Sequence, residues 1–80
     1  MIVGEAVRQR IIQLCQERDI SINKLSSISG VTQSTVNNIV SGRNNSATVS
    51  TIKKLCDGLG ITIDEFFHSE LFVGLEQEIK

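Results

Sequence analysis

Apolar residues recur every three or four positions along most of this chain, and no stretch alternates polar and apolar residues as a half-buried strand would. The first such stretch spans about residues 5–18. Its apolar residues fall on one face of a helix with about 3.6 residues per turn: Val7, Ile11, Leu14 and Cys15. The pattern therefore predicts an all-α chain whose first helix has one inward face.

Two short helices that meet at a tight turn are predicted by residues 22–41, INKLSSISGVTQSTVNNIVS. Leu25 and Ile28 supply the apolar contacts of the first helix, and Gly30 stands where a chain leaving a helix commonly needs a positive φ. Thr32 is the expected N-cap of the second helix. The apolar residues of that helix are spaced i, i+3, i+4 and form an inward stripe: Val36, Ile39 and Val40.

The other face of the second helix carries no charge. Since each helical residue advances by about 100°, this outward face holds the remaining residues: Gln33, Ser34, Asn37, Asn38 and Ser41. A solvated surface helix normally carries Lys and Glu, whereas Gln and Asn present the paired donor and acceptor that match adenine in the major groove of DNA. The face is typical of a recognition helix, although an amide-rich surface helix would show the same pattern.

Several features around this helix pair occur together in one known family. They are a small residue in the first helix, the turn, the buried positions of the second helix and the loop that follows: Ser26, Gly30, Val31, Val36, Ile39, Gly42, Arg43 and Asn45. With these residues, the segment resembles the helix-turn-helix of the phage repressor and Cro family. The similarity continues through IKKLCDGLGITIDEFF and covers residues 4–67. It implies a compact five-helix, lambda-repressor-like domain that binds duplex DNA as a homodimer and represses transcription.

The resemblance also implies roles for individual residues. Thr32 caps the recognition helix, and the residues facing base edges are Gln33, Ser34 and Asn38, with Asn37 as a fourth. Phosphate contacts, through side chains and through backbone N–H groups at helix N-termini, are expected from Ser21, Thr35, Arg43, Asn44 and Asn45. Three departures matter, and one of them concerns the loop, where Val40 replaces a common Glu and Ser46 replaces the usual Pro. Ile22 stands where many members have a phosphate-binding Gln that braces the recognition helix, and the absence of Arg from this helix shifts the expected readout toward adenine and thymine.

Charge is strongly segregated along the chain, although the net charge is −1. Residues 20–56 contain four basic residues and no acidic residue: Lys24, Arg43, Lys53 and Lys54. Residues 57–80 contain six acidic residues and only Lys80 as a base. Because acidic side chains repel the DNA backbone, an acid-free window around the helix pair suits a phosphate-facing surface. Taken alone, such a modest patch more often means an ordinary uneven surface than a DNA-binding surface.

Two more helices are predicted after the loop. One spans about residues 49–59, is capped by Thr48 and stopped by Gly60, and has an inward face of Val49, Ile52, Leu55 and Cys56. Thr62 and Glu65 form a capping box that starts the next, whose expected core anchors are Phe66 and Phe67. The helix-turn-helix domain is therefore expected to comprise residues 1–68.

Residues 69–80 predict a short amphipathic C-terminal helix capped by Ser69. Its apolar stripe lies among acidic residues and consists of Leu71, Phe72, Leu75 and Ile79. The stripe either folds back as extra core or pairs two subunits. Pairing is favoured, because a short DNA-binding chain usually needs a partner to span two half-sites. A toxin or a larger regulator would use the same surface, so an adaptor or antitoxin of the same fold is the alternative function.

The remaining features exclude other classes of protein. Eighty residues allow one domain, and without a long apolar run or a signal-peptide pattern we expect a soluble, cytoplasmic protein. No arrangement of nucleophiles, acids and bases indicates an enzyme, and no cofactor motif is present. Cys15 and Cys56 lack nearby Cys or His at ligand spacing, so they predict buried thiols and no metal site.

Overall fold

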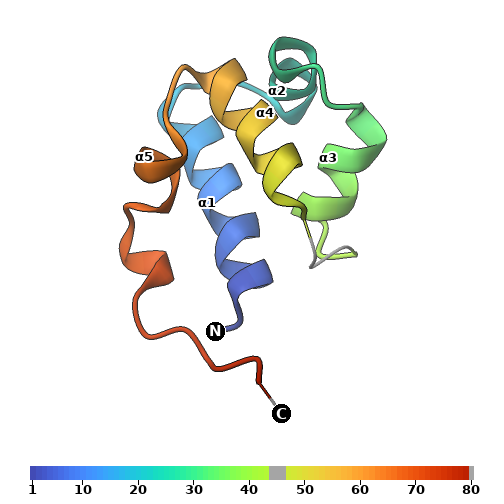
Figure 1. Ribbon diagram of the computed structural model, residues 1–80. Helices are drawn as coiled ribbons and strands as arrows, with labels where there is room; N and C mark the ends of the chain where they lie inside the picture. The colour runs from blue at the N-terminus through green and yellow to red at the C-terminus, as the bar shows by residue number, and fades with distance from the viewer. Residues whose placement is uncertain (44–46, 80) are drawn as a thin grey trace.

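The computed structural model describes residues 1–43 and 47–79. In that part of the chain there is no strand, and the helices follow one another in the order predicted (Figure 1). They are α1 (Val3–Glu17), α2 (Ile22–Ser29), α3 (Gln33–Val40), α4 (Val49–Leu59), α5 (Ile63–Phe67) and the 3₁₀ helix η1 (Glu70–Phe72). None of these helices is long and apolar enough to cross a membrane. The expected compact all-α, five-helix fold is confirmed, with α1 starting two residues before its predicted position.

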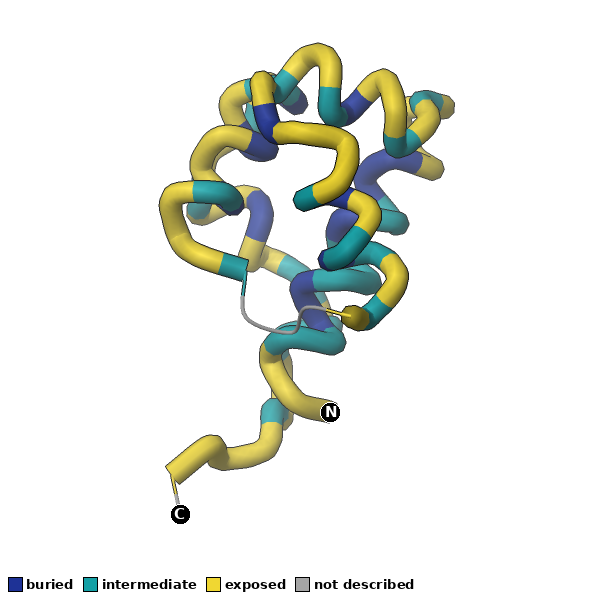
Figure 2. Tube along the Cα trace, turned by 90° about the vertical axis from the view of Figure 1, so that its right-hand side faces the viewer, coloured by how far each residue is buried: buried dark blue, intermediate teal, exposed yellow. Residues whose placement is uncertain are grey.

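A single hydrophobic core holds the helices together. Each of the five α-helices contributes a side chain with no exposed surface: Ile11, Leu25, Val36, Leu55 and Phe66. The buried positions lie on the inner sides of the helices, while the outer turns are exposed (Figure 2). Most of these helices are shorter than the about 12 residues that an isolated helix needs to be even marginally stable in water. They therefore depend on this shared core, and the predicted inward face of α1 is confirmed.

Side-chain caps define where four of the five α-helices begin. Ser21 Oγ accepts a hydrogen bond from the backbone N–H of Lys24 at 3.0 Å, which starts α2. Thr32 and Thr48 cap α3 and α4 in the same way, as predicted. At α5 the capping box is complete, because Thr62 Oγ1 accepts from Glu65 N–H at 3.0 Å and Glu65 Oε1 accepts from Thr62 N–H at 3.1 Å. Each such cap stabilises its helix by about 1 kcal/mol.

The close packing of α2 on α4 requires a glycine at position 58. A Cβ atom placed on Gly58 would lie only 2.8 Å from Ser29 Cα and 2.9 Å from Ile28 O. Separations this short do not occur between real side chains and backbone, so the two helices can approach this closely only because residue 58 is glycine. Within α2, Ser26 Oγ donates to Val31 O at 2.5 Å and ties the helix to the turn before α3.

Three apolar residues predicted to face inward are more exposed than expected. Val49 is 71% exposed, because it lies at the N-terminal end of α4 beyond the turns that pack against α2. Ile28, near the end of α2, is 38% exposed. Phe66 is completely buried but Phe67 is 36% exposed, since neighbouring helical residues point about 100° apart and cannot both enter the core.

The predicted C-terminal amphipathic helix over residues 69–80 is wrong. Ser69 does cap a helical turn, accepting from Leu71 N–H at 3.2 Å, but that turn is η1 and ends at Phe72. Val73 is extended and Gly74 has a φ of 70°, a left-handed conformation that breaks a helix. Residues 75–79 form no regular structure (Figures 1 and 2).

The C-terminal segment instead folds against the domain by other contacts. The Phe72 ring lies 4.8 Å from the Phe67 ring and 6.2 Å from the Phe66 ring, centroid to centroid, and packs against the core. Glu76 N–H donates to Met1 O at 3.1 Å, and its carboxylate lies 3.3 Å from the Met1 ammonium nitrogen. Phe72 therefore serves as extra core. Leu71 and Leu75 are half-buried, and Ile79 is 88% exposed.

Candidate nucleic-acid interface

The helix α3 lies at one side of the molecule, opposite α5 and the C-terminal segment (Figure 1). Its inner face is fixed by Val36 and Ile39, which are 0% and 2% exposed, and by the half-buried Val40, which packs against the core. This packing confirms the predicted inward stripe. The opposite face carries the four predicted base-reading residues: Gln33, Ser34 and Asn37 are exposed, and Asn38 is half-buried. Packing of the apolar stripe thus leaves an uncharged row of amides and a hydroxyl on the surface.

The amide of Gln33 is held by a residue that the sequence analysis did not identify. Gln33 Nε2 donates a hydrogen bond to Asn23 Oδ1, which joins the first turn of α3 to the first turn of α2. Ile22, where many repressors have Gln, is half-buried and packs against the core. No sequence signal could have paired Asn23 with Gln33, because ten positions separate them and their contact depends on the angle between the two helices.

Two predicted phosphate ligands have hydroxyl groups at helix starts. Ser21 is exposed, and its oxygen already accepts from Lys24 N–H, which leaves the O–H free to donate. Thr32 Oγ1 donates to Thr35 Oγ1 at 2.8 Å, so the Thr35 hydroxyl also keeps its donor. Arg43 is exposed just after α3. The other two predicted ligands, Asn44 and Asn45, lie outside the described residues.

The basic surface is smaller than the acid-free window suggested. Lys53 Nζ forms an ion pair with Asp57 one turn later on α4, where the acidic residue lies just beyond the window. Lys24, Arg43 and Lys54 are exposed. A window defined along the sequence misses this pair, because positions i and i+4 are neighbours on a helix. Three exposed cations, rather than four, are therefore available near α2, α3 and α4 without competition from Asp57.

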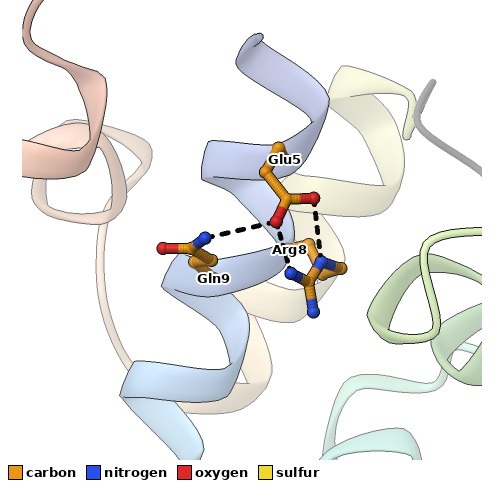
Figure 3. A network of polar contacts seen from close by, with 3 residues as sticks. All are labelled: Glu5, Arg8 and Gln9. Atoms are coloured by element: carbon orange, nitrogen blue, oxygen red, sulfur yellow. Dashed lines mark hydrogen bonds and ion pairs between the residues drawn. The ribbon is translucent and has the colours of Figure 1, made fainter. Parts of the chain in front are cut away.

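Basic residues of α1 are engaged within the protein. Glu5 accepts hydrogen bonds from Arg8 and Gln9; the Arg8 Nε to Glu5 Oε2 distance is 3.1 Å, and the Gln9 Nε2 to Glu5 Oε1 distance is 3.2 Å (Figure 3). The Arg8 hydrogen bond, followed by that of Gln9, lowers the pKa of Glu5 below its ordinary value.

Arg10 fastens the end of α5 to α1. Its Nε donates to Phe66 O at 2.7 Å and its Nη2 donates to Glu65 O at 2.9 Å. These carbonyls belong to the last turn of α5, whose oxygens have no partner within the helix. Arg10 therefore caps the C-terminal end of α5 and links this helix to α1, which lies far from it in the sequence.

Both cysteines are part of the core, as predicted. Cys15 is 5% exposed and Cys56 has no exposed surface. Burial raises the pKa of both thiols, which keeps them protonated and poorly reactive. They fill space as small apolar side chains.

Comparisons with known proteins agree with this arrangement. Residues 10–70 match the model of the Cro/C1-type HTH DNA-binding domain, a range that contains α2 to α5 and most of α1. Among solved structures, the chain is similar to one described as the crystal structure of the prophage Lp1 protein 11. The two share 33% sequence identity over 90% of this chain and 95% of that chain, with a TM-score of 0.78. No curated protein matches the sequence. On the fold, the exposed polar face of α3 and the matched range, the chain belongs to the Cro/C1-type helix-turn-helix family of DNA-binding domains.

Proposed function

We propose that this DNA-binding regulator is a transcriptional repressor that recognises a specific duplex sequence as a homodimer. The observation that carries the proposal is the uncharged face of α3, on which Gln33, Ser34 and Asn37 are exposed while Val36 and Ile39 are buried. A family of DNA-binding domains matches this chain, and amide side chains suit direct contacts to base edges in the major groove.

Within the proposed complex, the N-terminal half of α3 enters the major groove. Gln33 and Asn38 contact adenines through paired donor and acceptor atoms, while Ser34 and Asn37 add single hydrogen bonds. Ser21, Thr35 and Arg43 bind phosphates on either side of the groove, with Asn44 and Asn45 in the same role. Because α3 carries no charge, the phosphate contacts supply most of the affinity and the amides supply most of the specificity.

The homodimer follows from the size of the site. One helix eight residues long reads only one short half-site, so a second copy is needed to read a complete operator. We assign the contact to the C-terminal stripe of Leu71, Phe72, Leu75 and Ile79. Phe72 packs within its own subunit, so it would support the neighbouring apolar residues, and Leu75 and Ile79 would make the contact itself.

Selection of bound sequences from a random duplex pool tests the DNA-binding proposal. A palindromic operator with adenine or thymine at the Gln33 positions is expected, and Gln33→Ala should cost about 1–3 kcal/mol at one symmetric pair of bases. A promoter that carries this operator should be silenced by the protein in a reporter assay. If no sequence is enriched, the role in sequence recognition is refuted; if transcription from that promoter rises, the protein is an activator.

Sedimentation of point variants tests the dimer. Truncation after His68 is unsuitable because it would also remove Phe72 from the core. Instead, Leu75→Ser combined with Ile79→Ser should weaken the dimer and the operator affinity together while the monomer stays folded. Gln77→Ala, at an exposed position between them, is the matched control. A double variant that remains as dimeric as the parent would place the interface elsewhere.

An adaptor or antitoxin that binds another protein is the second candidate. It is favoured by the exposed apolar residues of the acidic C-terminal segment, since Val73 is 78% exposed and Ile79 is 88% exposed. Gel shifts separate the two functions. A chain that binds no duplex in the random pool, but forms a defined complex with a partner protein through this segment, would be an adaptor.

A further inference from the structure

The turn that joins α1 to α2 has the same hydrogen bonds as the turn that joins α4 to α5. After α1, Asp19 N–H donates to Gln16 O at 3.2 Å and Ile20 N–H donates to Cys15 O at 3.0 Å. The turn after α4, at Gly60, has two backbone bonds of the same span and the same lengths. Both turns are Schellman motifs, in which the residue just past the helix takes a left-handed conformation.

The two turns differ in the residue that takes this conformation. Gly60 has a φ of 72°, which glycine adopts freely. Asp19 has a φ of 53° and is the one non-glycine residue with a positive φ in the described part of the chain. Its Cβ atom makes the left-handed conformation less stable. Because the chain makes the same turn with glycine after α4, the geometry of the turn does not explain the aspartate.

The Asp19 carboxylate is exposed and lies close to the start of α2 in the chain. Among the described residues, no ion pair joins it to Arg18 or Lys24, the nearest cations in the sequence. It comes two residues before Ser21, which caps α2 and is a proposed phosphate ligand. Two residues span at most about 7 Å of chain, so a phosphate bound at Ser21 would lie within roughly 10 Å of this carboxylate.

We propose that Asp19 limits the affinity of the protein for DNA by repelling the phosphate bound at the start of α2. The inference rests on the DNA-binding role proposed for α2 and α3. The repulsion acts on all duplexes alike, because the phosphate backbone carries no sequence information. A uniform loss of affinity leaves weak, non-specific complexes unpopulated, while complexes that also have base contacts survive. The turn at Gly60 has no such role, since α5 lies on the side of the molecule opposite α3 (Figure 1).

Asp19→Asn tests the charge alone, because asparagine has the same shape and tolerates the left-handed conformation. At low salt this variant should bind operator and random duplexes about two- to fourfold more tightly than the parent, since each subunit of the dimer loses one repulsion over roughly 10 Å. Base preference should not change. The gain should shrink as salt is raised, because screening then acts over a shorter distance. Glu70→Gln removes an exposed charge on the side opposite α3 and is the matched control, with little change in affinity expected.

Thermal unfolding separates the charge of Asp19 from its backbone strain. Asp19→Gly removes both, so it should bind DNA as Asp19→Asn does and melt roughly 2–8 °C above the parent. Asp19→Asn should melt close to the parent. A structural role is the alternative, because a carboxylate near the start of a helix can stabilise that helix. That role predicts a lower melting temperature in Asp19→Asn and no gain in affinity.

The outcomes separate this inference from the proposed function. A parent protein that binds no duplex refutes both. If the parent selects an operator but Asp19→Asn binds it no more tightly at low salt, only the role of Asp19 is overturned. A gain that persists at high salt, or an altered base preference, would also overturn it, because neither result comes from repulsion of phosphate. A uniform, salt-sensitive gain in Asp19→Asn and Asp19→Gly, absent from Glu70→Gln, supports it.

Discussion

Substitution of Gly58 by alanine tests how closely α2 must approach α4. The new Cβ would lie 2.8 Å from Ser29 Cα, 2.9 Å from Ile28 O and 2.9 Å from Ser29 Cβ. Carbon atoms in contact prefer separations of about 3.5–4.0 Å, so α2 would have to retreat by roughly 0.7 Å or more. Two of the three atoms belong to the backbone and cannot rotate away.

The expected magnitude is a balance of two terms. Overpacking a tight contact costs about 1–3 kcal/mol, and the better helix propensity of alanine returns about 1 kcal/mol. Because rigid backbone takes most of the collision, we expect the upper part of the overpacking range and a net loss of about 1–2 kcal/mol. For a domain of this size, that loss corresponds to a fall in melting temperature of roughly 5–15 °C.

Urea and thermal unfolding, followed by circular dichroism, measure this loss. Ser50→Ala is the matched control: it is exposed on the same helix and should leave stability the same or slightly higher through propensity alone. A Gly58→Ala protein as stable as the parent, or more stable, would refute the reasoning. It would mean that α2 and α4 can separate at no cost.

Three other predictions concern charge and packing. Arg43→Ala should make the dependence of DNA affinity on salt shallower by about one unit for each phosphate that is no longer neutralised, with base preference intact; an altered preference would show that Arg43 reads a base. Phe72→Ala removes a half-buried ring and should lower unfolding free energy by about 1.5–2 kcal/mol, less than for a fully buried ring; an unchanged melting temperature would contradict its assignment to the core. The lowered pKa of Glu5 means that its pair with Arg8 stabilises the fold above the ordinary carboxyl pKa and loses this effect as pH falls through the folded-state pKa. NMR titration should show the Glu5 pKa rising toward its ordinary value in Arg8→Ala, and an identical titration in both proteins would contradict the pairing.

Much of the candidate site could be predicted because it depends on local geometry. Helix periodicity placed Val36 and Ile39 inside, which left Gln33, Ser34 and Asn37 exposed without any knowledge of the other helices. The caps at Thr32, Thr48 and Thr62 could also be predicted from sequence, because each joins atoms only three residues apart. Their role in DNA binding stays a prediction, since base and phosphate contacts form only in the complex.

Periodicity alone was misleading at helix ends and at the C-terminus. Val49 has helical spacing but is the first residue of α4 and is 71% exposed, and Phe67 is 36% exposed because it points about 100° away from the buried Phe66. At the C-terminus the spacing of apolar residues predicted a helix. Phe72 instead packs on Phe66 and Phe67, and the chain turns at Gly74 with a positive φ. Spacing records which residues are apolar and does not show whether a surface exists to bury them.

The sequence by itself determined the order of the helices, most of their ends and the outward face of α3, because these depend on residues a few positions apart. Tertiary structure alone decided that Asn23 contacts Gln33, that Arg10 caps α5 and that α2 packs closely on α4 at Gly58. Each of these contacts joins residues distant in the chain, and each depends on the angles at which helices pack around the shared core.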